Sequence, residues 1–324
     1  GLDDSTTDFT FTLTAVDNAP MPSTGTTVTL KAGENGSFGE IEYGYTALGD
    51  EDNKTFTYKI TETVPTNPIA GLKYDAEPHT VTVTLSWNAT DGTLTAVPST
   101  QTDPETFTNV YEEGYLKVTK TDKDTSAPLT GAEFTVYDDA SCSDDSIVDV
   151  MVTGEGGSAT LSKGLPVGTY WVKETQAPAG YTVDDTTAKE VTLTKDHTYL
   201  SPYGTTWTDT VKTVKVTLPA KKTLENLTSD EEFEFVLAEV TDGAPMPVSG
   251  EETITLKAGE TKNFGEILFK YTDLAGANAK EFTYTITETE PTEKISGVTY
   301  DTTAHTVKLT LSWDGTDLKV TSSA

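Results

Sequence analysis

The sequence contains a single cysteine, Cys142, so no disulfide can form within the chain. A secreted protein without disulfides must obtain its stability from another source. Histidine and methionine are also scarce, with three residues of each. The histidines are isolated, and His79 and His305 occupy equivalent positions of an internal repeat, which favours a structural role. We therefore predict no metal site and no cofactor.

Long apolar runs are absent as well, and no stretch approaches the length of a membrane-spanning helix. Basic residues are in the minority: 22 Lys and Arg stand against 52 Asp and Glu, a formal net charge of −30. Such a surface repels nucleic acid and anionic membranes, so we expect neither nucleic-acid binding nor membrane insertion. Because no signal peptide or sorting tail is visible, we interpret residues 1–324 as a soluble excerpt.

Catalytic signatures are missing too. The sequence shows no Ser-His-Asp arrangement, phosphate-binding loop or calcium-loop spacing. We therefore expect no enzyme acting on an external substrate.

An internal repeat dominates the organisation of the chain. The first copy contains FTFTLTAVDNAPMP, TVTLKAGENGSFGEI and FTYKITETVP; the second contains FEFVLAEVTDGAPMP, TITLKAGETKNFGEI and FTYTITETEP. A different unit, from GYLKVTKTDKD to TTWTDTVKT, separates the copies. The sequence thus predicts three domains, at 1–112, 113–213 and 214–324.

All three predicted domains are rich in Thr, Val and Tyr, with alternating apolar and polar positions and frequent turn residues. This pattern is typical of antiparallel β-sandwiches. No amphipathic helix of useful length is apparent. We predict an all-β protein of three tandem immunoglobulin-like β-sandwich domains in an elongated array.

Alternation along a strand also indicates which charged residues face inward. In the middle domain Lys120 shares its parity with Leu116 and Val118. On the same reasoning Glu174 follows Val172 toward the core, and Asp209 follows Trp207. Each inward charge alone would be costly. Together they form either a buried ion-pair network or a reactive site.

The outer domains repeat this pattern. In the third domain alternation leads to Lys222 on one strand and to Glu288 on another. In the first domain it leads to Glu62, and Asn109 lies on the same face as its neighbours Phe107 and Tyr111.

Specific motifs decide between these alternatives. The middle domain resembles the collagen-adhesin B-type (SpaA/Cna-B) domains of Gram-positive surface proteins through LKVTKTDKDTSAPLTGAEFTVYD, VKETQAPAGY and WTDTVKT. The outer domains resemble the FctA-type pilin isopeptide-linkage domain through LPAKKTL, YTITETEP, GVTYDTTAHTV and FTNVY. In both families an autocatalytic amide bond joins a lysine of the first strand to an Asn or Asp of the last, assisted by a glutamate.

Carried over by motif, the resemblance implies a bond between Lys120 and Asp209 assisted by Glu174. It also implies partial sites at Glu62 with Asn109 in the first domain and at Lys222 with Glu288 in the third. Burial favours a neutral, nucleophilic lysine and a protonated glutamate. A protonated Glu174 could then polarise the Asp209 carbonyl oxygen and shuttle protons. Asp209 stands where Asn is frequent in the family, so water rather than ammonia would leave.

Each outer domain lacks one partner within the sequence. The repeat places the lysine of the first domain just before Gly1, and the acceptor of the third domain just beyond Ala324. We expect that the first strand of the first domain and the last strand of the third are missing because the chain was cut from a longer array. Strand exchange between neighbouring subunits is the alternative.

The resemblance predicts the structural shaft of a Gram-positive pilus or the stalk of a cell-wall-anchored adhesin, located outside the cell. The expected partners are neighbouring pilin subunits or adjacent domains of the same surface protein. Two alternatives stay open: a head domain that binds a host ligand, and accessory modules of a secreted enzyme.

Overall fold

The computed structural model describes residues 7–225 and 230–323, which fold almost entirely as β-strands and connecting turns. The all-β prediction is confirmed. Within the described ranges the helical elements are three short 3-10 turns, η1 (Tyr45–Leu48), η2 (Asp144–Ser146) and η3 (Tyr271–Leu274). None of the helices there is long and apolar enough to cross a membrane.

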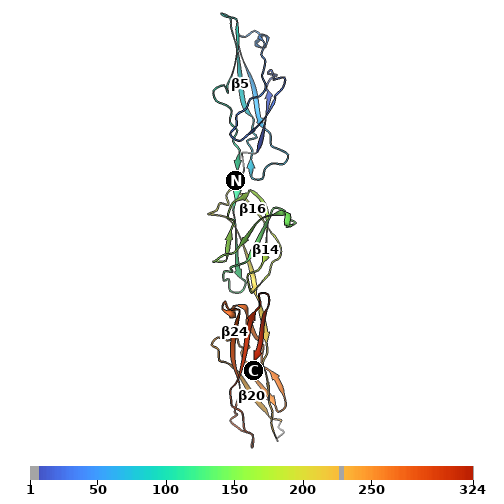
Figure 1. The fold of residues 1–324 in the computed structure, drawn as a ribbon, viewed down its shortest axis with the longest axis vertical. Helices are drawn as coiled ribbons and strands as arrows, with labels where there is room; N and C mark the ends of the chain where they lie inside the picture. Colours follow the sequence, from blue (N-terminus) through green and yellow to red (C-terminus); the bar gives the residue numbers. More distant parts are fainter. Residues whose placement is uncertain (1–6, 226–229, 324) are drawn as a thin grey trace. The chain divides into compact units, whose positions relative to one another are not determined.

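The chain divides into two compact units. Unit 1 comprises the described residues within 1–115, 162–169 and 192–203, and unit 2 those within 116–161, 170–191 and 204–324. Figure 1 traces the strands of both units by colour along the sequence. Each unit is described by itself below.

Unit 1 is built on a five-stranded antiparallel sheet with the order β2-β1-β3-β5-β6. Its strands are β1 (Asp8–Ala15), β2 (Thr27–Lys31), β3 (Asn53–Glu62), β5 (His79–Asn88) and β6 (Thr93–Pro98). One face packs around a core of alternating residues that includes Leu13, Tyr58 and Leu85. Two short pairs complete the unit: β4 (Leu72–Lys73) with β7 (Val110–Tyr111), and β8 (Glu113–Gly114) with β13 (Leu165–Pro166).

Unit 2 holds the greater part of two four-stranded sheets. The first has the order β12-β9-β17-β15 and the second β11-β10-β14-β16. Their bounds are β9 (Leu116–Asp122), β12 (Ser158–Thr160), β15 (Tyr181–Val183), β17 (Tyr203–Val211), β10 (Glu133–Tyr137), β11 (Ile147–Val152), β14 (Gly168–Gln176) and β16 (Lys189–Leu193). Alternate residues of β9, from Leu116 to Asp122, are buried, so the alternation read from the sequence is the alternation of the folded strand.

The C-terminal part of unit 2 carries a second five-stranded sheet, in the order β21-β20-β24-β25-β26. Its strands are β20 (Glu232–Glu239), β21 (Thr253–Lys257), β24 (Ala279–Glu288), β25 (His305–Trp313) and β26 (Leu318–Ser323). The sequence repeat is also a repeat of register, because Phe11 pairs with Glu62 in unit 1 and Phe235 pairs with Glu288 here. The two copies therefore aim their glutamates from corresponding positions.

Outside the five-stranded sheets the copies differ. The second copy has two further pairs, β18 (Thr213–Val216) with β23 (Ile267–Lys270) and β19 (Pro219–Lys221) with β22 (Thr261–Asn263). No described segment of unit 1 corresponds to β18 or β19, and no described segment of the second copy corresponds to β7.

Candidate functional site

The three inward-facing side chains of the middle segment meet in unit 2. The Lys120 Nζ atom lies 2.5 Å from the Glu174 Oε2 atom and 2.5 Å from the Asp209 Oδ1 atom. Lys120 comes from β9 and Asp209 from its neighbour β17, whereas Glu174 comes from β14 of the other sheet. The site therefore joins the two sheets at their buried faces.

Aromatic packing keeps water away from this site. The side chains of Lys120, Glu174 and Asp209 are all fully buried. Phe134 pairs with Glu174 across β10 and β14, and its ring lies 4.7 Å from the ring of Trp207. An amine and two carboxyl groups thus lie in contact within an apolar core, where charge is costly.

That environment determines the protonation of the glutamate. Burial raises the pKa of Glu174 to about 7, and the nearby Asp209 adds to the increase, although the hydrogen bond from Lys120 opposes it. The buried Glu174 Oε1 and Asp209 Oδ2 atoms accept no hydrogen bond from any described N–H or O–H group. The two carboxyls are close enough to influence one another.

This arrangement favours condensation chemistry. A lysine nitrogen in hydrogen-bond contact with a carboxyl group already has the proximity required for attack on its carbon atom. Glu174 contacts the same nitrogen and can accept its proton.

The site in unit 1 contains the predicted pair, Glu62 and Asn109. Among the described residues, no lysine contacts this pair. The Asn109 Nδ2 atom donates to the Glu62 Oε1 atom at 2.7 Å. Glu62 is buried, burial raises its pKa, and its Oε2 atom accepts no hydrogen bond from a described group. The backbone N–H of Asp75 donates to the Asn109 Oδ1 atom at 2.8 Å.

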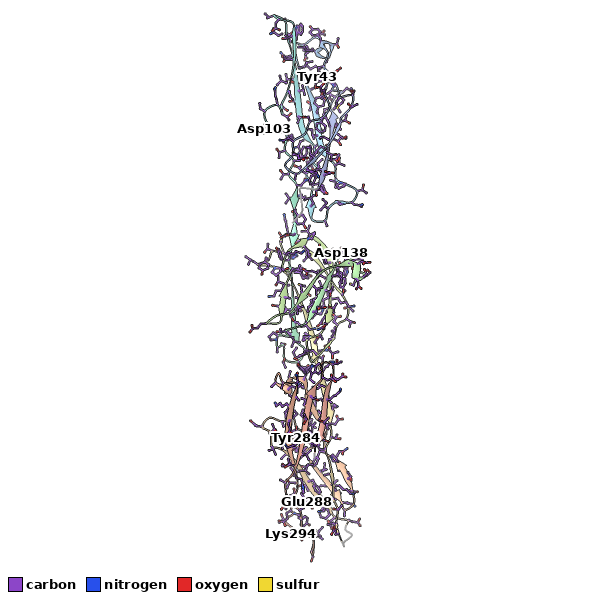
Figure 2. All side chains as sticks on the ribbon, in the orientation of Figure 1. Tyr43, Asp103, Asp138, Tyr284, Glu288 and Lys294 are labelled. Carbon is purple, nitrogen blue, oxygen red and sulfur yellow. The ribbon has the colours of Figure 1, made fainter. Side chains whose placement is uncertain are left out.

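The second copy contains the complementary half. The Lys222 Nζ atom lies 2.5 Å from the Glu288 Oε1 atom, and both side chains are buried. Glu288 lies on the same strand, β24, as Tyr284, and both are labelled in Figure 2. The lysine also lies over the ring of Phe233, 4.2 Å from its centre. Among the described residues, no Asn or Asp side chain forms a hydrogen bond or an ion pair with Lys222.

Sequence reasoning missed a set of backbone contacts. Asp75 and Asp184 each donate a backbone N–H to the side-chain oxygen of the acceptor residue, Asn109 and Asp209 respectively. At the equivalent place in the second copy the backbone N–H of Asp301 donates to the Glu288 Oε2 atom. The repeat aligns Asp75 with Asp301, but a side-chain pattern does not reveal what a backbone amide contacts.

The histidines and tryptophans have structural contacts. His79 bonds Glu105 at 2.7 Å and Asp75 at 3.3 Å. Trp87 and Trp313 each pack edge-on against a tyrosine, with ring centres about 5 Å apart. No group of three or more His, Cys, Asp or Glu side chains suited to a metal ion occurs in the described part of the chain.

Comparison with family models adds independent information. Residues 2–112 and 218–324 match the Spy0128-like isopeptide containing domain, and residues 114–206 match a prealbumin-like fold domain of the SpaA type. The chain belongs to the Spy0128-like isopeptide family. The resemblance inferred from the motifs is thereby confirmed.

Individual relatives cover the chain unevenly. A collagen adhesin from Staphylococcus aureus is 36% identical over 95 residues, which is 29% of this chain and 8% of that protein. Among solved structures, the Bacillus anthracis TIE protein is similar over 92% of this chain and 48% of its own, with 17% identity and a TM-score of 0.35. The major pilin from Streptococcus pyogenes covers 63% of this chain and 91% of its own, with 16% identity and a TM-score of 0.34.

Proposed function

We propose that this chain is part of an extracellular shaft, either of a Gram-positive pilus or of a cell-wall-anchored surface protein, and that covalent Lys–Asn/Asp bonds stabilise its domains. The observation that carries the proposal is the contact of Lys120 with both Asp209 and Glu174 in a fully buried site. The family match to isopeptide-containing domains over residues 2–112 and 218–324 supports it.

The proposed bond forms without an external catalyst. Lys120 attacks the side-chain carbon of Asp209, one water molecule leaves, and Glu174 moves the protons. In this reaction the chain is its own substrate. Its partners are neighbouring subunits or adjacent domains of the same surface protein.

A covalent bond between β9 and β17 determines which residues of the domain carry mechanical tension. Force that enters the domain at 113 and leaves at 213 passes through Lys120 and Asp209 directly. The residues between Lys120 and Asp209 carry no tension, so pulling on the two ends of the domain does not unfold the sandwich. With the proposed domain boundaries, 1–112, 113–213 and 214–324, Lys120 comes soon after the first residue of the middle domain and Asp209 shortly before its last, so most of that domain lies between them in sequence.

Single-molecule stretching of the full chain by its termini tests this function. With the bond in place, the segment between Lys120 and Asp209 contributes nothing to the unfolded length. In Lys120→Arg, which keeps the positive charge but cannot form the bond, about 90 further residues extend by roughly 300 Å in total. Equal contour lengths for the two proteins would contradict the proposal.

A further inference from the structure

We propose that the backbone N–H of Asp184 is the oxyanion donor for formation of the Lys120–Asp209 bond, and that the backbone N–H of Asp75 has the same role toward Asn109. This inference rests on the proposed function and names a catalytic group in addition to the glutamate. Two groups act on each acceptor side chain. The backbone N–H donates a hydrogen bond to the oxygen that stays in the product, and the glutamate exchanges protons with the atom that leaves.

The geometry in unit 2 identifies the two oxygens of Asp209. The backbone N–H of Asp184 donates to the Oδ1 atom at 3.1 Å. A backbone N–H can only donate, so the atom that faces it is fixed as an acceptor throughout the reaction. The other oxygen, Oδ2, is buried and accepts no hydrogen bond from any described donor. It is the oxygen available to take a proton from Glu174.

Unit 1 shows the same division on a different sheet topology. The N–H of Asp75 donates to the Asn109 Oδ1 atom at 2.8 Å, and the Asn109 Nδ2 atom donates to Glu62 at 2.7 Å. The amide nitrogen, which would leave as ammonia, thus contacts the glutamate, and the carbonyl oxygen contacts the backbone. In unit 1 the donor follows β4 and the acceptor precedes β7, whereas in unit 2 the donor follows β15 and the acceptor lies on β17, so two different sheets give the same contacts.

Side-chain contacts hold each donor in place. The Asp184 carboxylate accepts a hydrogen bond from the Thr210 hydroxyl at 2.8 Å and contacts Lys123 Nζ at 3.0 Å. The Asp75 carboxylate accepts the backbone N–H of Thr108 at 3.1 Å. Each aspartate therefore binds the residue next to the acceptor with its side chain and the acceptor itself with its backbone. The strand that carries the acceptor is fixed relative to the donor.

The reaction balances with these groups alone. The neutral Lys120 nitrogen forms a bond to the Asp209 side-chain carbon, and the electrons of the C–Oδ1 double bond move to Oδ1, where the Asp184 N–H stabilises the negative charge. A protonated Glu174 supplies a first proton to Oδ2, then accepts a proton from the attacking nitrogen and supplies that one to Oδ2 as well. The intermediate collapses, the C–Oδ2 bond breaks, and one water leaves. No oxidant or reductant is needed.

Two substitutions at one position separate the N–H from the carboxylate. Asp184→Ala keeps the backbone N–H, whereas Asp184→Pro removes it, and residue 183 already has the extended conformation that a following proline requires. Each full-length variant is made in a short pulse of cell-free translation, and its intact mass is then followed over time. Asp185→Pro is the matched control for a proline in this turn.

We expect Asp184→Pro to lose water about 10²–10³-fold more slowly than the wild type, the usual cost of removing one oxyanion donor. Asp184→Ala and Asp185→Pro should stay within about tenfold of the wild type, because both keep the donor. Loss of water by Asp184→Pro at the rate of Asp185→Pro would overturn the inference and leave the proposed function intact. Failure of the wild type to lose water would instead overturn the proposed function.

A second measurement applies if Asp184→Pro does not fold, as judged by near-ultraviolet circular dichroism. In the wild type, a hydrogen bond from Asp184 produces a through-bond NMR coupling between its amide nitrogen and the side-chain carbonyl carbon of Asp209. Detection of that coupling supports the assignment of the donor. Its absence in a spectrum that shows backbone couplings of β17 overturns it.

Discussion

Lys120 and Asp209 lie on adjacent strands with Nζ and Oδ1 2.5 Å apart, and both are fully buried. A buried pair of this kind is weak evidence for stability when it stays ionic, because desolvation offsets the attraction. Conversion of the Lys120–Asp209 pair into an amide removes both charges and joins the two residues covalently. The contact with Glu174 is what makes that conversion chemically reasonable.

Intact mass is the first test of this bond. We expect the wild-type chain to be lighter than its sequence by one water, and Glu174→Gln to recover the full sequence mass. Asp209→Asn provides a further check, because it should lose ammonia and reach the same final mass as the wild type. A wild-type chain with its full sequence mass would show that the pair stays ionic.

The bond should also contribute to the free energy of unfolding. It closes a loop of about 90 residues, which by analogy with disulfide loops is worth about 4–5 kcal/mol. We expect both Glu174→Gln and Lys120→Arg to lose roughly this amount in urea denaturation. The two variants change different members of the site, so their shared loss reports the missing bond. Variants that unfold at the wild-type urea concentration would argue against a cross-link.

The outer sites should stay open within this chain. Because Asn109 has no lysine and Lys222 has no Asn or Asp among their described contacts, we expect both to be recovered unmodified in peptide mapping. A synthetic peptide of residues 102–113, TDPETFTNVYEE, should attach to Lys222 with loss of ammonia, because it carries the acceptor strand that the repeat predicts there. The same peptide with Asn109→Ala is the control and should not attach.

The segment of unit 1 that carries the acceptor Asn109, residues 105–111, should be more stable at lower pH. Partial burial acts to lower the pKa of His79, but its hydrogen bonds and charge interactions with Glu105 and Asp75 outweigh that effect and raise it above 6.5. A raised pKa in the folded state means that the stabilisation is fully present below pH 6.5 and is lost as pH rises through the folded pKa.

Hydrogen exchange measures this effect. Corrected for intrinsic rates, amides of residues 105–111 should be better protected at pH 5.5 than at pH 8.5. In His79→Gln the corrected protection should not change with pH. A wild-type segment whose protection is independent of pH would show that the His79–Glu105 contact does not stabilise it.

The sequence by itself determined the all-β fold class, the internal repeat and the inward direction of the charged residues. Alternation with a period of two is a local property, so the burial of Lys120, Glu174 and Asp209 could be predicted from their neighbours. The register of the repeat was equally accessible, since matching segments fold to matching pairs such as Phe11 with Glu62 and Phe235 with Glu288.

Only the tertiary structure decided which groups of other strands contact Lys120, Glu174 and Asp209. Asp184 and Asp209 are far apart in sequence, and the group that Asp184 contributes is its backbone N–H, which is the same in every residue except proline. No pattern of side chains can mark such a donor. Its place is set by the pairing of β15 with β17, which brings Val183 opposite Asp209 and so directs the next amide toward the acceptor oxygen.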